Sequence, residues 1–301
     1  MSKQALAALE AAVTAVLQAV GGDLKVLVEK LRTVDAAFDA AVAEAGVGAV
    51  RAALRTSVLP HVKVPEILAK VDFASSLVSD HRPFFRTTME VIAEDADSMD
   101  LQQLLSAVGA CRRNLGYMSM MAFAELLRSK LAGDQLPAAS NLRCKALYEL
   151  HMAAYQQAEA ASGETAQALY QRSKELAEQS AEEARKAGDP CGALFALMNV
   201  SGLLLPKMGQ WEEGYGLSEQ VSFEAEVLAV EAPDDEARKR PLRVAMNAYL
   251  HRVDMLTRNG GRKGAVEALL AQLNGNPIYQ ACREHADVAA LVQRAQRYVK
   301  V

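Results

Sequence analysis

Residues 193–220 read ALFALMNVSGLLLPKMGQWEEGYGLSEQ, and this stretch decides the fold. Two apolar helical runs, expected over 191–208 and 211–230, meet at a short turn that contains Gly209. A glycine at such a turn supplies the positive φ that ends one helix and redirects the chain. Because the turn is short, the two helices are expected to lie antiparallel.

The same pattern continues through the C-terminal part of the chain. Apolar periodicity and short turns predict helices over 138–160, 164–187, 191–208, 211–230, 234–259, 263–273 and 281–300. One face of the 164–187 helix carries small residues and one tyrosine: Ala166, Tyr170, Ser173, Ala177, Ser180 and Ala184. Its other face carries charge: Lys174, Glu178, Glu182, Arg185 and Lys186. A seam of small residues permits close helix packing, so this helix is expected to bury that face.

The first part of the chain is helical as well. Apolar periodicity, interrupted by glycine and proline, predicts helices over 6–20, 24–45, 48–59, 65–80, 83–94 and 100–131, the last with a break near Gly116. The clearest linker is GDQLP at 133–137, which divides an N-terminal helical region, 1–135, from a second helical region, 136–301. No run of alternating β-branched residues bounded by hairpin turns occurs. The predicted fold class is therefore all-α.

Composition and charge narrow the possible functions. The chain has 33 basic and 37 acidic residues and a formal net charge of −4, so we expect no binding to a nucleic-acid backbone. The apolar N-terminal stretch is interrupted by Glu10, and the uncharged run that follows is too short to span a bilayer. We expect a cytoplasmic protein that does not enter a membrane.

No motif for a metal, nucleotide or cofactor stands out. The cysteines lie far apart without a CxxC pair and are expected to be reduced thiols: Cys111, Cys144, Cys191 and Cys282. Cys282 with His285 is the one pair at a metal-like spacing, and one pair is weak evidence. The glycine-rich RNGGRKG at 258–264 lacks the strand and the Ser or Thr of a phosphate-binding loop. We read it as a turn and expect no cofactor.

A methionine-rich patch falls on one predicted helix. It consists of Tyr117, Met118, Met120, Met121 and Phe123. Methionines adapt to irregular core gaps, and they also serve adaptable binding surfaces. We expect this patch to belong to the core.

The stretch from 193 to 220 resembles a tetratricopeptide repeat, a helix-turn-helix unit of about 34 residues. The resemblance rests on a small residue inside the first helix, the turn, an aromatic residue after it and a small residue in the second helix: Gly202, Gly209, Trp211 and Gly214. The preceding Gly188-Asp189-Pro190 resembles the turn between successive repeats. The resemblance implies helix pairs stacked as a right-handed superhelix over 136–301, closed by a C-terminal capping helix.

A second, weaker match covers residues 245–277. Gly260 matches the turn, Ala265 the small residue of the second helix, and Pro277 the closing proline. The turn glycines of the two matches are 51 residues apart, which departs from the repeat length of about 34 residues. Longer helices, or an insertion at 231–240, must therefore separate the two units.

The resemblance also implies that the first helix of each pair lines a concave binding surface. The matching positions are Ala196, Asn199, Leu203 and Lys207 in one unit and Asn247, Asp254 and Arg258 in the next. Arg243 joins the second set. Intervals of four, seven and four residues separate Arg243, Asn247, Asp254 and Arg258, which places them on one helix face. The opposite face is apolar: Leu242, Ala245, Tyr249, Val253 and Leu256.

The candidate partner-binding residues are therefore Asn199, Leu203, Lys207, Arg243, Asn247, Asp254 and Arg258. An asparagine and several cations in a groove can hydrogen-bond a peptide backbone and pair with acidic side chains or a C-terminal carboxylate. The other interpretation of these residues is an ordinary solvated helix face.

Three functions remain open at this point. The first is a scaffold or adaptor that binds a protein or peptide, and the second is a structural subunit of a larger assembly or homo-oligomer. The third is an enzyme with an unfamiliar helical active site, for which one predicted helix start offers His81, Arg82, Arg86, Glu90 and Glu94. The absence of a recognisable catalytic motif favours the scaffold, and we expect no enzymatic activity.

Overall fold

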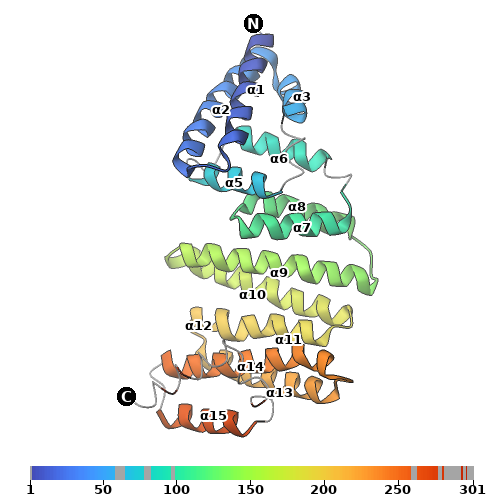
Figure 1. Cartoon of the computed structure of the whole chain (residues 1–301), viewed down its shortest axis with the longest axis vertical. Helices are drawn as coiled ribbons and strands as arrows, with labels where there is room; N and C mark the ends of the chain where they lie inside the picture. Colours follow the sequence, from blue (N-terminus) through green and yellow to red (C-terminus); the bar gives the residue numbers. More distant parts are fainter. Residues whose placement is uncertain are drawn as a thin grey trace. The chain divides into compact units, whose positions relative to one another are not determined.

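The computed structural model describes residues 2–57, 65–77, 83–95, 99–258 and 263–276, together with residues 280, 293 and 296. Every regular element in these ranges is a helix, and successive helices pack in antiparallel pairs (Figure 1). The prediction of an all-α fold is confirmed. The chain forms two compact units, unit 1 over Met1–Asp134 and unit 2 over Gln135–Val301.

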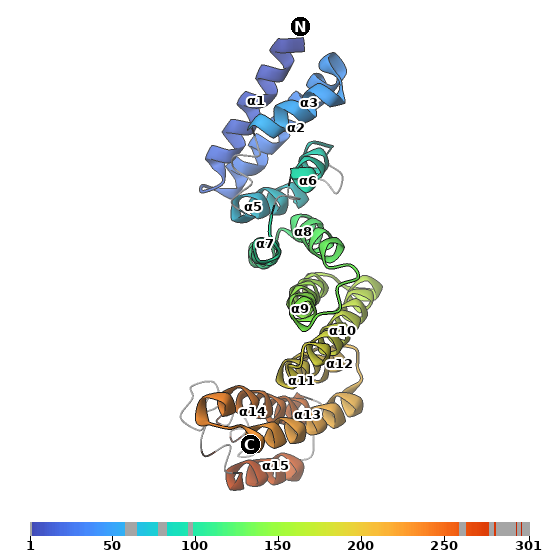
Figure 2. The ribbon, with the colours of Figure 1, turned by 90° about the vertical axis from the view of Figure 1, so that its right-hand side faces the viewer.

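Unit 1 contains the helices α1 (Ser2–Ala19), α2 (Leu24–Ala45), α3 (Val47–Ser57), α5 (Pro65–Ser76), α6 (Pro83–Asp95), α7 (Leu101–Arg113) and α8 (Tyr117–Lys130). The pairs α1–α2 and α7–α8 make the most extensive contacts (Figure 2). Asp23 caps α2 by accepting a hydrogen bond from the backbone N–H of Lys25 at 2.8 Å. The predicted break near Gly116 is confirmed, because α7 ends at Arg113 and α8 starts at Tyr117.

The methionine-rich patch is only partly in the core. Met120 and Phe123 are 1 % and 2 % exposed, whereas Met118 and Met121 are 51 % and 53 % exposed. The prediction was wrong for the last two because α8 buries a single face, and residues one or two positions away point elsewhere.

A buried carboxylate of α5 caps α8. Asp72 is 3 % exposed, and its Oδ2 accepts hydrogen bonds from the backbone N–H of Ser119 at 2.8 Å and from the Ser119 hydroxyl at 2.9 Å. Ser119 lies in the first turn of α8, where backbone N–H groups have no partner within the helix. Burial raises the pKa of Asp72, and the hydrogen bonds from Ser119 and Met118 oppose that shift. Asp72 therefore contributes mainly as a hydrogen-bond acceptor.

Replacing Asp72 tests this role. We expect Asp72→Ala to destabilise unit 1 by about 1–3 kcal/mol, because it leaves buried donors without an acceptor. Asp72→Asn keeps an acceptor and should cost less than half as much. Urea unfolding followed by far-UV circular dichroism measures both, and equal losses for the two variants would contradict the assigned role.

Unit 2 contains α9 (Pro137–Ala160), α10 (Gly163–Lys186), α11 (Pro190–Asn199), η2 (Val200–Leu204), α12 (Leu205–Lys207), α13 (Trp211–Glu231), α14 (Asp235–Arg258) and α15 (Lys263–Gly275). The largest interfaces join α9 with α10 and α13 with α14, while α11 packs on α10, α13 and α14 (Figure 1). Because each helix is antiparallel to the next, α9, α11–α12 and α14 run in the same direction.

Two glycine turns end helices of unit 2 in the same way. At the end of α10, Gly188 has φ +74°, and the N–H of Asp189 donates to the Ala184 carbonyl at 2.9 Å. At the end of α12, Gly209 has φ +79°, and the N–H of Gln210 donates to the Leu205 carbonyl at 2.8 Å. Both are Schellman turns, which satisfy the last carbonyls of the helix. The predicted positive φ at Gly209 is confirmed.

Close approach explains two other glycines of the 193–220 stretch. A Cβ at Gly202 would lie 1.7 Å from Nδ1 of His251, so the glycine makes room for that ring on α14. A Cβ at Gly214 would lie 2.8 Å from the Ser201 carbonyl oxygen. One turn after Gly214, the Ser218 hydroxyl donates to Ser201 Oγ at 2.8 Å. The predicted role of Gly214, to let α13 approach the preceding helix, is confirmed.

The helix predicted over 191–208 is interrupted by a π-helical turn, Val200–Leu204. Pro206 lies two residues after this turn, and a proline in a regular α-helix would lack the N–H and press its ring against the carbonyl four residues earlier. The widened turn precedes the proline and changes the hydrogen-bond pattern there. An inserted π turn also rotates the following residues relative to those before it.

Serines fix the register of α9 on α10. Ser173 donates to the His151 carbonyl at 2.9 Å, and Ser180 donates to the Cys144 carbonyl at 3.0 Å. Both serines belong to the predicted small-residue seam of α10, and every member of that seam is buried, as predicted. His151 is itself 0 % exposed, and its Nδ1 lies 2.7 Å from Ser173 Oγ.

One segment of unit 2 has the length and apolar composition of a membrane span. It covers Pro190–Lys207, with a mean hydropathy of 1.2. Within unit 2, 61 % of this segment is buried. It forms the central helix against which α10, α13 and α14 pack, so its apolar composition matches its place in a protein core.

Candidate partner-binding site

The C-terminal ends of α9 and α12 are joined by an ion pair. Lys207 Nζ lies 2.8 Å from Glu159 Oε1, and both side chains are 39 % exposed. Glu159 also accepts a hydrogen bond from the hydroxyl of Tyr170 on α10. Lys207 and then Tyr170 lower the pKa of Glu159, while burial and Glu159 raise the pKa of Tyr170 to about 12.

Arg258, at the end of α14, acts electrostatically on the same end of α9. Tyr155 of α9 is half-buried; burial and Glu159 raise its pKa, and the charges of Lys207 and Arg258 lower it. Both cations therefore lie within electrostatic range of this hydroxyl. We call this group, Tyr155, Glu159, Lys207, Asp254 and Arg258, the end cluster.

Arg258 forms an ion pair within α14. Its Nε lies 2.8 Å from Asp254 Oδ2, one turn earlier on α14, and the Arg258 side chain is 57 % exposed. Exposed ion pairs contribute only about 0–1 kcal/mol to stability, so a competing carboxylate can replace Asp254 at little cost. The same holds for Lys207 and Glu159. The end cluster thus presents two cations that an acidic ligand can reach.

Three predicted residues of the 191–208 helix do not lie on an exposed face. Asn199 is 6 % exposed, and Leu203 packs, partly buried, against the core cluster that contains Leu204. Ala196 is 2 % exposed. The π-helical turn contains Leu203 and lies between Asn199 and Lys207, so the four-residue spacing no longer places the three on one face.

The amphipathic pattern predicted for α14 is present. Arg243 and Arg258 are exposed, and Asn247 and Asp254 are half-buried. The predicted apolar face lies inside: Leu242, Ala245, Tyr249 and Val253 are buried, and Leu256 packs against the same cluster. Arg243 and Asn247 thus extend the face of Asp254 and Arg258 toward the start of α14.

The sequence prediction missed Tyr155 and Glu159. The candidate face was read from two turn glycines, and neither belongs to the α9–α10 pair. The sequence does contain a signal for them. Glu159 lies four residues before Gly163, where α10 starts, and Lys207 lies four residues before Trp211, where α13 starts. Applying the helix-pair register to α9 would have included both residues.

Several other sequence predictions fall outside the described residues. They concern Gly260, Pro277, the Cys282–His285 pair, the 281–300 helix, and His81 and Arg82. The rest of the proposed N-terminal polar group forms ion pairs between helices: Arg51 of α3 pairs with Glu90 at 2.6 Å and with Glu94, and Arg55 pairs with Glu94 as well. Arg86 is exposed on α6.

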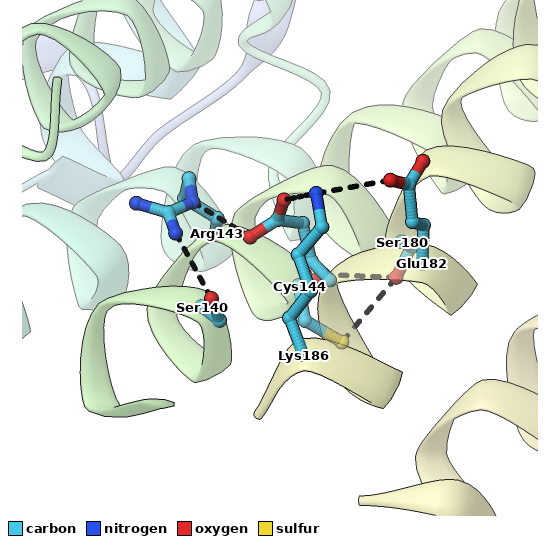
Figure 3. A network of polar contacts seen from close by, with 7 residues as sticks. Ser140, Arg143, Cys144, Ser180, Glu182 and Lys186 are labelled. Carbon is cyan, nitrogen blue, oxygen red and sulfur yellow. Dashed lines mark hydrogen bonds and ion pairs between the residues drawn. The ribbon is translucent and has the colours of Figure 1, made fainter. Parts of the chain in front are cut away.

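A second polar network lies at the other end of the α9–α10 pair (Figure 3). Arg143 Nε donates to Glu183 Oε2 at 2.7 Å, and Lys186 lies 3.0 Å from both Glu182 and Glu183. Burial opposes the ionised form of Glu183, but Arg143 and Lys186 together lower its pKa. Arg143 and Glu183 are only 20 % and 14 % exposed. This network serves to join α9 to α10.

The described cysteines are free thiols. Burial raises the pKa of Cys144 and Cys191, and it raises the pKa of Cys111 to about 12. A thiol with a raised pKa is a poor nucleophile at neutral pH. Among the described residues, no three His, Cys, Asp or Glu side chains meet as a group that could hold a metal ion.

Comparison of the chain with protein-family models, with curated proteins and with solved structures gives no significant match.

Proposed function

We propose that unit 2 is a tetratricopeptide-like helical repeat that binds an acidic segment of a partner protein. In this proposal the chain is a scaffold or adaptor without enzymatic activity, and unit 2 continues as a right-handed superhelix. The helix order, the two Schellman turns and the close packing at Gly202 and Gly214 support the repeat assignment.

The observation that carries the binding proposal is the end cluster. The charges of Lys207 on α12 and Arg258 on α14 both act on the hydroxyl of Tyr155 on α9. An acidic side chain or a C-terminal carboxylate can pair with the two cations, and the Tyr155 hydroxyl can donate a third hydrogen bond. Asn247 and Arg243 continue the contact along α14.

Affinity capture with quantitative mass spectrometry tests this function. The full chain is compared with a Lys207→Glu/Arg258→Glu variant, and Arg185→Glu is the matched control. Like Arg258, Arg185 is an arginine in the last turn of a helix, but it lies at the far end of α10. We expect proteins with acidic segments to be lost from the double variant only. Equal capture by all three proteins would contradict the proposal.

The structural-subunit alternative remains a candidate because of one observation. α13 exposes large apolar side chains, and permanent partners commonly cover such surfaces. Light scattering of the purified chain separates the two: an adaptor is expected to be monomeric alone, whereas a homo-oligomeric subunit is not.

A further inference from the structure

α13 has more apolar surface than unit 2 covers. Its inner face, Val221, Ala225 and Ala229, is buried against neighbouring helices at 0–2 % exposure. A second apolar stripe points outward: Phe223, Val227 and Val230 are 66 %, 40 % and 80 % exposed. The intervals of four and three place the three side chains on one line along the helix.

Carboxylates border this stripe on both sides. By helical geometry Glu219 and Glu226 lie along one edge, and Glu224 and Glu231 lie along the other. α13 carries six glutamates and no lysine or arginine. An apolar line between two acidic edges is the complement of a helix with an apolar line between two basic edges.

The contacts of the four glutamates leave most of this charge in place. Glu224 and Glu226 accept hydrogen bonds from the neutral amides of Gln220 and Asn276, both at 2.8 Å. Among the described residues, Glu219 alone of the four forms an ion pair, with Arg252, whose nitrogen lies 2.8 Å away and whose guanidinium stacks over the ring of Tyr215.

The negative charge at the C-terminal end of α13 also destabilises this helix. The helix ends on Glu231, and its last turn contains no basic residue. The C-terminus of a helix carries partial negative charge, so a carboxylate there is unfavourable and a cation is favourable. Arg238 already offsets part of this charge, since its Nε donates to the Ala229 carbonyl at 3.1 Å, and a basic partner along this end would offset the rest.

We propose that the outer face of α13, Phe223, Val227 and Val230 with its glutamate edges, binds a basic amphipathic helix of a partner protein. The apolar side of that helix covers the stripe, and its lysines or arginines pair with Glu224, Glu226 and Glu231. This surface is separate from the end cluster, which selects acidic ligands, and the proposal does not depend on the function of that cluster.

The test uses the full chain and a synthetic helical peptide with leucines on one face and lysines on both flanks. Two other peptides serve as probes, a scramble of the same composition and a version with glutamate in place of lysine. Fluorescence anisotropy titrations are expected to show binding of the leucine–lysine peptide, with the other two at least about tenfold weaker. Equal binding of the scramble would overturn the proposal.

Variants locate the binding surface. Phe223→Ser and Glu231→Lys are each expected to weaken the leucine–lysine peptide by about tenfold or more, since one removes apolar contact and the other reverses an edge charge. Glu182→Lys, an identical charge change at an exposed position of α10, should leave the affinity unchanged. Phe223→Ser changes an exposed side chain, and the fluorescence of Trp211 verifies that unit 2 remains folded.

Besides equal binding of the scramble, three results would overturn the proposal. Unchanged affinity of Phe223→Ser would remove the stripe as the binding surface. An equal loss for Glu182→Lys and Glu231→Lys would show general attraction to an acidic protein. A wild-type dimer that Phe223→Ser converts to a monomer would assign the face to a second copy of this chain.

Discussion

Gly202→Ala destabilises unit 2 by about 2–3 kcal/mol in our account, the upper part of the range for overpacked cores. The added Cβ would lie 1.7 Å from Nδ1 of His251 and 2.1 Å from its Cγ, so the ring or the helix must move. Neither moves freely, because α14 is held against α13 along its length. Urea unfolding followed by the fluorescence of Trp211, the single tryptophan of the chain, reports on unit 2.

Gly216→Ala is the matched control for this prediction. A Cβ at Gly216 meets nothing within 4 Å, although this glycine also lies inside a helix. We expect it to stabilise the protein by about 0.5–1 kcal/mol, because alanine favours a helix interior. Stabilisation by Gly202→Ala would contradict the packing described here. Adding His251→Ala to Gly202→Ala should recover part of the loss if the ring is the obstacle.

Mild acid destabilises unit 2 through His151, which is buried, and His251, which is half-buried. Burial lowers the pKa of His151 to about 4 and that of His251 to about 4, and backbone hydrogen bonds involving Ser173 and Met198 oppose the shift. In the unfolded chain both histidines bind a proton below about pH 6.5, whereas the folded protein does not until about pH 4. The free energy of unfolding therefore falls as the pH drops between these values, by up to about 3 kcal/mol for each histidine.

The free energy of unfolding is measured at about pH 7 and at about pH 5.5. Both values lie above the pH range in which glutamates titrate. We expect the free energy of unfolding to fall by about 1 kcal/mol or more per histidine over this interval. Replacing His151 with Gln removes one titrating group, so the pH dependence should decrease by about half. An unchanged free energy of unfolding across the interval would show that both histidines are accessible to protons in the folded protein.

The sequence predicted the helices well where local chemistry determines them. The predicted 24–45 helix has those bounds because Asp23 caps its start and Gly46, with φ +80°, ends it. The turn at Gly209 and the buried seam of α10 were likewise readable, since a positive φ and a stripe of small residues have direct sequence signals.

The features that were not predicted from the sequence depend on contacts between helices. The π-helical turn Val200–Leu204 leaves apolar periodicity almost unchanged, and only Pro206 hints at it. Asn199 was therefore placed on the same face as Lys207, although it is buried. Tyr155 and Glu159 join the site through contacts between helix pairs, which depend on how α9 packs rather than on its own pattern.

If the end cluster binds an acidic segment, two substitutions in it should change the affinity in opposite directions. Once a captured partner supplies an acidic peptide, isothermal titration calorimetry compares Arg258→Glu with Asp254→Asn. We expect Arg258→Glu to weaken binding about tenfold or more, because it removes a cation that pairs with the ligand. Asp254→Asn should strengthen binding, because it removes the carboxylate that competes for Arg258 at 2.8 Å. Equal affinities for the wild type and both variants would contradict the claim that this cluster binds the partner.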